Sequence, residues 1–173
     1  MPALIDGLPL HVLVVHAVVV LVPLAVLGSI AVVLWPAARR RYGWLVVAVA
    51  AVATVCIPVA TSSGDALEHR LPRTLLIEAH ARLGGQLLIF VAGLLVSLAA
   101  FMAIHRLASV GRGARGPGTV TATAPPRMVA GAIAALTIVL AVVSAVQVYR
   151  IGDSGAGAAW SDTRYIAPTP MDS

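Results

Sequence analysis

Four long apolar segments limit what this chain can fold into. A helix needs about 20 apolar residues to cross the hydrocarbon core of a bilayer, and the windows of that length lie at about 10–35, 43–62, 85–104 and 128–148. The chain of 173 residues is 60% hydrophobic and only 11% charged, whereas a soluble domain carries more charge. The sequence therefore predicts an all-α protein, an antiparallel bundle of four transmembrane helices.

The predicted bundle forms a single membrane domain over residues 1–160. No basic lead precedes the first apolar segment, which is also too long for a cleavable signal peptide, so we expect it to remain. Pro36 to Gly43 predicts a tight turn that makes the first two helices a hairpin. Composition rich in Gly, Pro and Thr predicts a flexible inner linker over 108–126, and a loosely ordered tail is expected over 161–173.

The placement of arginine predicts the orientation in the membrane. All twelve basic residues are arginines, and the connections after the first and third spans contain no acid but carry Arg39, Arg40, Arg41, Arg106, Arg112, Arg115 and Arg127. Because cytoplasmic loops carry the excess of arginine, we expect both termini on the outer side. This asymmetry, rather than nucleic-acid binding, explains the net charge of +5.

Histidine is rare in membrane helices unless it has a function, and four of the five histidines are predicted at the outer end. His11 and His16 begin the first span, and His69 and His80 lie before the third. At about 1.5 Å per helical residue, His11 and His80 reach similar depths, with His16 deeper. We therefore predict a histidine site between the first and third helices.

Two kinds of cofactor fit these residues. A b-type haem would be held by two imidazoles on facing helices beside small residues, and the residues expected to bind it are His11, His16, His80, Gly84 and Gly85. A transition metal, either copper, zinc or iron, would take imidazole and carboxylate ligands. The residues expected to supply them are His11, His16, His69, Glu78 and His80, with Asp65 as the alternative carboxylate. Alternatively, the histidines form a structural polar network in a non-catalytic membrane subunit or interaction protein.

The remaining polar residues predict neither a haem relay nor a hydrolase. The inner end offers only His105, whereas a relay needs ligand pairs near both faces, so we expect His105 beside Arg106 to be an interfacial residue. Ser62, Ser63 and Ser154 are expected to be turn residues, with the glycines near Ser154 ending the fourth helix. Because no nucleophile has an obvious base and oxyanion partner, a stand-alone enzyme is not expected.

Three stretches resemble a known family: GLPLHVLVVHAVVVLVPLA, LEHRLPRTLLIEAHARLGG and VYRIGDSGAGAAW. Together with the four spans, they resemble the bacterial membrane family known as domain of unknown function 2231, over most of the chain except the inner linker and the tail. The chain departs from the family pattern at Ala17 and Val18, where an aromatic residue and a proline are usual. The resemblance implies a four-helix protein of the bacterial inner membrane, and relatives of similar architecture joined to iron–sulfur domains imply redox work.

These observations together predict an integral membrane protein with an outer-face histidine cluster that binds haem b or a transition metal for electron transfer. The expected partners are the lipid bilayer and either a redox partner or a second copy of the chain. Nucleic acid is not expected among them.

Overall fold

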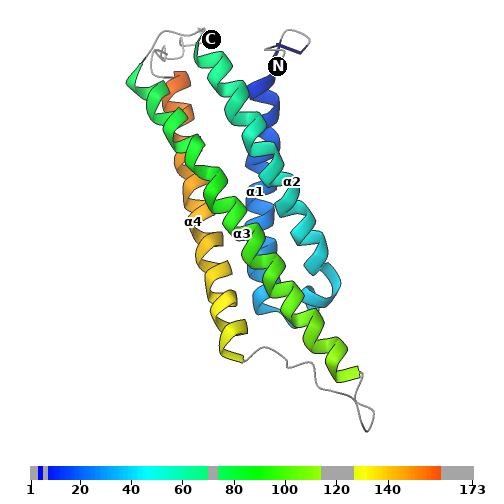
Figure 1. The fold of residues 1–173 in the computed structure, drawn as a ribbon. Helices are drawn as coiled ribbons and strands as arrows, with labels where there is room; N and C mark the ends of the chain where they lie inside the picture. Colours follow the sequence, from blue (N-terminus) through cyan, green and yellow to red (C-terminus); the bar gives the residue numbers. More distant parts are fainter. Residues whose placement is uncertain (1–3, 6–7, 70–73, 114–126, 161–173) are drawn as a thin grey trace, which may run out of the picture.

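The computed structural model describes residues 4–5, 8–69, 74–113 and 127–160, and over these residues the chain forms four long helices (Figure 1). They are α1 (Leu10–Leu34), α2 (Pro36–Glu68), α3 (Leu75–Gly113) and α4 (Arg127–Trp160). Two strands of two residues each, β1 (Leu4–Ile5) and β2 (Leu8–Pro9), pair antiparallel ahead of α1. Each helix is long and apolar enough to cross a membrane. The predicted all-α bundle of four membrane helices is thus confirmed.

Each helix packs against two neighbours. The contacts are most extensive within two hairpins, α1 with α2 and α3 with α4, and α2 with α3 and α1 with α4 join the hairpins side by side. This arrangement puts α1 and α3 at opposite corners of the bundle. One end contains the start of α1 and α3 and the end of α2 and α4 (Figure 1). We call it the histidine end, after His11, His16, His69 and His80, and the other the arginine end, after Arg39, Arg40, Arg41 and Arg106.

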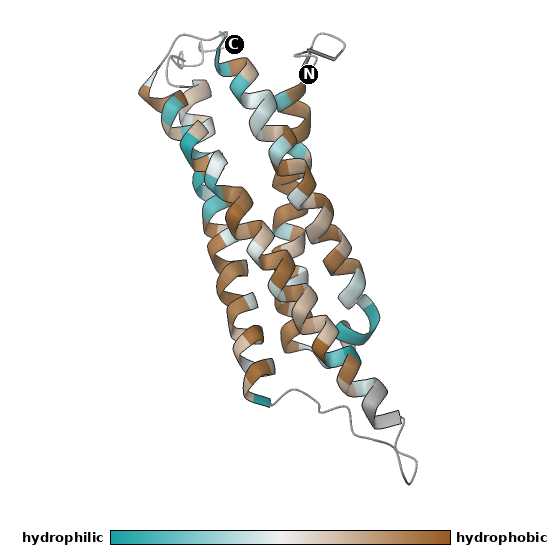
Figure 2. Ribbon diagram, viewed as in Figure 1, coloured by the Kyte–Doolittle hydropathy of each residue, from teal (hydrophilic) through white to brown (hydrophobic). Residues whose placement is uncertain are grey.

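The outward surface of the bundle is apolar along its middle. Val20, Val55, Ile89 and Val96 are between 64% and 71% exposed, and Figure 2 shows hydrophobic residues along the middle of every helix, with hydrophilic ones nearer the ends. A soluble monomer rarely exposes apolar surface on this scale. Hydrocarbon around the bundle satisfies such a surface, which agrees with the membrane assignment.

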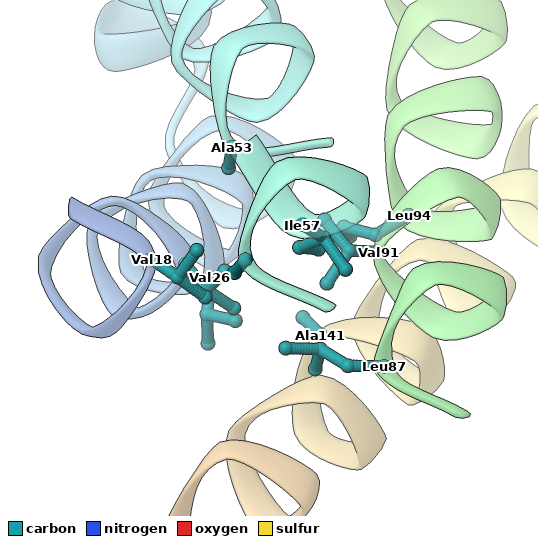
Figure 3. Close-up of a cluster of buried hydrophobic side chains, with 10 residues drawn as sticks. Val18, Val26, Ala53, Ile57, Leu87, Val91, Leu94 and Ala141 are labelled. Carbon is teal, nitrogen blue, oxygen red and sulfur yellow. The ribbon is translucent and has the colours of Figure 1, made fainter. Parts of the chain in front are cut away.

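The bundle is held together by two clusters of buried apolar side chains. Figure 3 shows the larger one, in which Ile57 of α2 lies among Val91 and Leu94 of α3, all at most 2% exposed. Ala141 brings α4 close to the same cluster, because a small residue lets helix backbones approach. The smaller cluster lies towards the arginine end and consists of Val32, Leu98, Phe101 and Met102.

The connection between α1 and α2 is shorter than predicted. Trp35 alone separates the two helices, and the segment predicted as a turn, 36–43, is the first part of α2. Pro36 explains the difference, since proline suits the first position of a helix, where its missing N–H has no intrahelical partner to lose. The predicted hairpin is present, but its turn is a single residue.

Two other helices extend beyond their predicted ends. α3 continues to Gly113, into the segment predicted as a linker over 108–126. α4 runs through its glycines to Trp160, where a turn was predicted. Glycine alone does not end a helix that packs against a neighbour, and a membrane helix satisfies its backbone groups internally. The rest of the predicted linker and the predicted tail, 161–173, lie outside the described residues.

Candidate functional site

A cavity of about 1010 Å³ lies between the two hairpins at the histidine end. All four helices line it, mainly with apolar side chains, and the polar side chains among them belong to His11, His16, Thr61, Asp65, Glu68, His80 and Trp160. Sites for small molecules and cofactors usually measure about 300–1,000 Å³. The cavity is therefore large enough for a planar cofactor.

His11 of α1 is held by α2. Its Nδ1 atom lies 2.9 Å from the backbone oxygen of Ala60, and because a carbonyl oxygen only accepts, Nδ1 carries a hydrogen and donates it. The hydroxyl of Ser63 donates to the same carbonyl at 2.9 Å. The His11 ring lies against Gly64, where an added Cβ would come within 3.0 Å of Cε1 and Nδ1. A side chain at residue 64 would thus push the ring away.

His80 of α3 is held by α4 in a similar way. Its Nδ1 atom lies 3.1 Å from the hydroxyl oxygen of Ser154. That hydroxyl donates its own hydrogen to the carbonyl of Ile151 at 2.9 Å, so Nδ1 of His80 must be the donor. The ring lies against Gly155, where an added Cβ would be 3.0 Å from Cε1 and 3.2 Å from Nδ1.

The two histidine cradles follow one pattern. In each, a carbonyl is followed three residues later by a serine that bonds it and four residues later by the glycine beneath the ring: Ala60, Ser63 and Gly64 on α2, and Ile151, Ser154 and Gly155 on α4. The two differ in the acceptor, which is the Ala60 carbonyl for His11 and the Ser154 hydroxyl for His80. The hairpins therefore repeat the same device around the cavity.

The cradles determine which nitrogen each ring has for a ligand. Because Nδ1 of His11 and of His80 donates to the neighbouring helix, the lone pair of the neutral imidazole lies on Nε2. This is the arrangement in which histidine binds a metal through one nitrogen while the other is fixed by a hydrogen bond. The two rings belong to helices at opposite corners of the bundle, and both line the cavity. His11 and His80 are thus held in a similar way and line one cavity.

The structure places the other predicted ligands differently from this pair. His16 lines the cavity, but its Nδ1 atom bonds the Val12 carbonyl of its own helix at 2.6 Å. His69 bonds the Asp65 carbonyl in the same manner at 2.7 Å, and neither His69 nor Glu78 is among the described lining residues. Within the described ranges no group of three or more His, Cys, Asp or Glu side chains could hold a metal ion.

Gly84 and Gly85 lie beside open space in the cavity. Both line it, and a Cβ added to either would meet no described atom within 4 Å. They stand four and five residues after His80, where α1 has Val15 and His16 after His11. The α3 side of the cavity therefore has open space beside both glycines.

His105, at the arginine end, was predicted to be an interfacial residue but is half-buried and bonded. Its Nε2 atom lies 2.7 Å from a guanidinium nitrogen of Arg39, which only donates, so Nε2 is the acceptor. Its ring meets Phe101 edge-on, with the centroids 4.5 Å apart. Arg39 also donates to the Val32 and Val33 carbonyls near the end of α1. This His105 nitrogen therefore already has a partner.

The family comparison covers the whole of this arrangement. A family described as predicted membrane protein (DUF2231) matches residues 7–168. The chain belongs to the DUF2231 family. The matched residues of this DUF2231 protein include all four helices and both cradles. Comparison with curated proteins and with solved structures finds no match.

Several residues of the site were not predicted from the sequence. Ser63 and Ser154 were expected to be turn residues, yet both are helical and belong to the cradles. Gly64 and Gly155, which lie against the rings, were not predicted as site residues either. The available signal was the Ser-Gly pair, which occurs at 63–64 and again at 154–155, near the end of the second helix of each hairpin.

Proposed function

We propose that this DUF2231 protein holds a b-type haem in the cavity, between His11 and His80, and serves electron transfer. The observation that carries the proposal is the repeated cradle, which fixes each imidazole through Nδ1 and keeps the Nε2 lone pair for a ligand. Two such imidazoles on facing helices are what axial ligation of haem requires. When bound, haem would supply reversible one-electron chemistry.

The shape and lining of the cavity support haem more than a single metal ion. The cavity of about 1010 Å³ is mostly apolar, and Gly84 and Gly85 leave room on one side. Protein sites for zinc and copper usually have three or four protein ligands, and the described residues bring together no such group. A cofactor that needs only two protein ligands agrees better with this arrangement.

The proposal puts the cavity at the outer face of a bacterial inner membrane. The arginine end carries Arg39, Arg40 and Arg41 at the start of α2 and Arg106 near the end of α3, and cytoplasmic segments carry such an excess of positive charge. Both termini would then be outside, and a redox partner would approach from that side or from within the bilayer.

A second candidate is a non-catalytic membrane subunit in which the histidines have a structural role. The bonds from His11 to α2 and from His80 to α4 favour it, because each joins the two helices of one hairpin. On this view the cavity is a packing defect or a partner's binding site, and replacing either histidine lowers the free energy of unfolding without removing any cofactor.

The test is an absorption spectrum, oxidised and reduced, of the protein purified from membranes with haem supplied during expression, together with elemental analysis. We expect a reduced b-type band that His11→Ala and His80→Ala each abolish. His69→Ala is the matched control and should keep the band, since His69 bonds only within its own helix in the described contacts. A full spectrum in His80→Ala would contradict the proposal, and a wild-type protein without haem or metal after reconstitution would favour the structural role.

A further inference from the structure

We infer that His16 binds the headgroup of a lipid-soluble quinone that enters the cavity from the bilayer. A role of this quinone in carrying electrons rests on the proposed function, whereas its binding at His16 does not. The inference concerns a residue that two-imidazole ligation of haem leaves without a role, although it lines the same cavity.

His16 lies where the cavity meets the outer surface of α1. Val12 and Val19, one turn before and nearly one turn after it, also line the cavity and are 41% and 48% exposed. His16 is itself exposed. A wall whose side chains are both cavity-lining and exposed is an opening, and on this apolar helix the opening faces lipid. A ligand dissolved in the bilayer can therefore reach His16.

The chemistry of this wall selects the ligand. Nδ1 of His16 donates to the Val12 carbonyl at 2.6 Å, which leaves the Nε2 lone pair as a hydrogen-bond acceptor for a hydroxyl group. Around it the α1 wall is built from Val12, Val15, Val18 and Val19. A quinol offers a flat apolar ring with hydroxyl groups at its edge, so it satisfies both the valines and the imidazole. In the protonated state, the same nitrogen would donate to the carbonyl of the oxidised quinone.

His16 has no counterpart at the equivalent position of the other hairpin. Five residues after His11 stands His16, whereas five residues after His80 stands Gly85, with no described atom within 4 Å of an added Cβ. The two hairpins thus match at His11 and His80 but differ deeper in the cavity. A haem held by both His11 and His80 would account for the match between the hairpins. A quinone held by His16 on the α1 side would account for the difference between them.

The fluorescence of Trp160 can report binding of the quinone. It lines the cavity, whereas Trp35 and Trp44 lie at the start of α2, at the other end of the bundle. Decylubiquinone, added to the full-length protein in detergent micelles, should quench Trp160 fluorescence and reach saturation. Trp160→Phe measures the background from the two remaining tryptophans. If wild type and Trp160→Phe show the same unsaturable quenching, the inference is overturned.

The decisive comparison is between His16→Leu and His69→Leu. Each histidine bonds its own helix, but only His16 is among the described lining residues. We expect the affinity for decylubiquinol, whose hydroxyl can donate to Nε2, measured by its displacement of decylubiquinone, to fall at least tenfold in His16→Leu, to recover partly in His16→Gln and to stay at the wild-type value in His69→Leu. Wild-type affinity in His16→Leu overturns the inference, and so does equal displacement of the quinone by oleate, which would mark a general acyl-chain groove.

The haem band in the same samples separates this inference from the proposed function. An unchanged band in His16→Leu, with lost quinone affinity, supports both. Loss of the band in His16→Leu overturns the inference, since His16 would then hold the cofactor. Quinone binding that depends on His16 in a wild-type protein without haem supports the inference and contradicts the proposed function. Haem without saturable quinone binding overturns the inference alone.

Discussion

The two ends of the bundle use histidine in opposite ways. At the arginine end, Nε2 of His105 accepts a hydrogen bond from Arg39, and the ring packs against Phe101. At the histidine end, His11 and His80 donate through Nδ1, so the lone pair stays on Nε2. The nitrogen that bonds the neighbouring helix is therefore Nε2 in His105 and Nδ1 in His11 and His80, which leaves Nε2 of the latter two as the nitrogen that a ligand could use.

Packing differs between the two ends in the same sense. Near the arginine end, a Cβ added to Gly43 would overlap Met102, and one added to Gly28 would lie 2.8 Å from Val46. Near the histidine end, Gly84 borders only open space among the described atoms. α2 is thus closely packed against α1 and α3 near the arginine end, whereas the cavity lies at the histidine end. The variants below test that contrast, from the largest expected effect to the smallest.

Blocking one cradle should have the largest effect. Gly155→Leu places a side chain where the His80 ring lies, since even a Cβ would be 3.0 Å from Cε1, so we expect haem affinity to fall by about a hundredfold. Gly157→Leu is the control on the same helix, because a Cβ there meets no described atom within 4 Å. Haem bound per protein, measured as the pyridine haemochrome, reports the result. Equal haem content in both variants would show that the cradle does not hold the ligand.

Breaking the bonded cluster at the other end should change stability instead. Arg39→Ala removes the donors to Val32, Val33 and His105, and we expect the free energy of unfolding to fall by about 2–3 kcal/mol. Arg40 is exposed, so Arg40→Ala should stay within about 0.5 kcal/mol of wild type. Unfolding followed by circular dichroism in micelles measures both. Loss of the haem band from folded Arg39→Ala would contradict the independence of the two ends.

Removing a hydroxyl from a cradle should have an intermediate effect. Ser154→Ala deletes the acceptor for Nδ1 of His80, which orients the ring, and we expect about tenfold weaker haem binding. Ser63→Ala should cost less, since the Ala60 carbonyl, not the Ser63 hydroxyl, accepts from His11. Titration of apoprotein with haemin measures both affinities. A larger loss in Ser63→Ala than in Ser154→Ala would reverse the assignment of acceptors.

The smallest effect on stability is expected for two buried serines in the middle of the bundle. Ser144 is fully buried, and its hydroxyl has no hydrogen-bond partner among the described residues, so Ser144→Ala should be neutral or stabilise by up to about 1 kcal/mol. Ser29 is equally buried but donates to the Ala25 carbonyl at 2.6 Å, so Ser29→Ala should destabilise slightly. Thermal unfolding of the two variants side by side tests the sign. Clear destabilisation by Ser144→Ala would point to a buried water bonded to its hydroxyl.

The spans were predictable because the bilayer sets their length and composition. The similar depth of His11 and His80 was also predictable, since both lie near the starts of the parallel helices α1 and α3 and the rise per residue is fixed. The rotation of each helix was not predictable in this way, because apolar residues occupy every face and no stripe marks the interior. Which histidines lie beside one another therefore needed the structure.

The glycines of α4 show why the cradles were missed. A Ser-Gly pair near the end of a predicted span is typical of a turn in soluble proteins, yet Ser154 and Gly155 lie within a helix that continues to Trp160. Packing against α3, rather than intrinsic propensity, decides the conformation there. Arg39 was missed for a related reason, since topology explained its charge and gave no cause to look for its bonds.

The repeated cradle has a consequence for how such a site can arise. A half-length chain with one histidine and one Ser-Gly pair would form one cradle within its own hairpin, and pairing with an identical copy across a two-fold axis would place two cradles around one cavity. In that homodimer every substitution would appear twice. Because this chain encodes both hairpins, its two halves can differ in sequence. They do so in the cavity wall, where His16 lies on the α1 side and Gly85 on the α3 side. Covalent joining of the halves thus permits an asymmetric site within a nearly symmetric bundle.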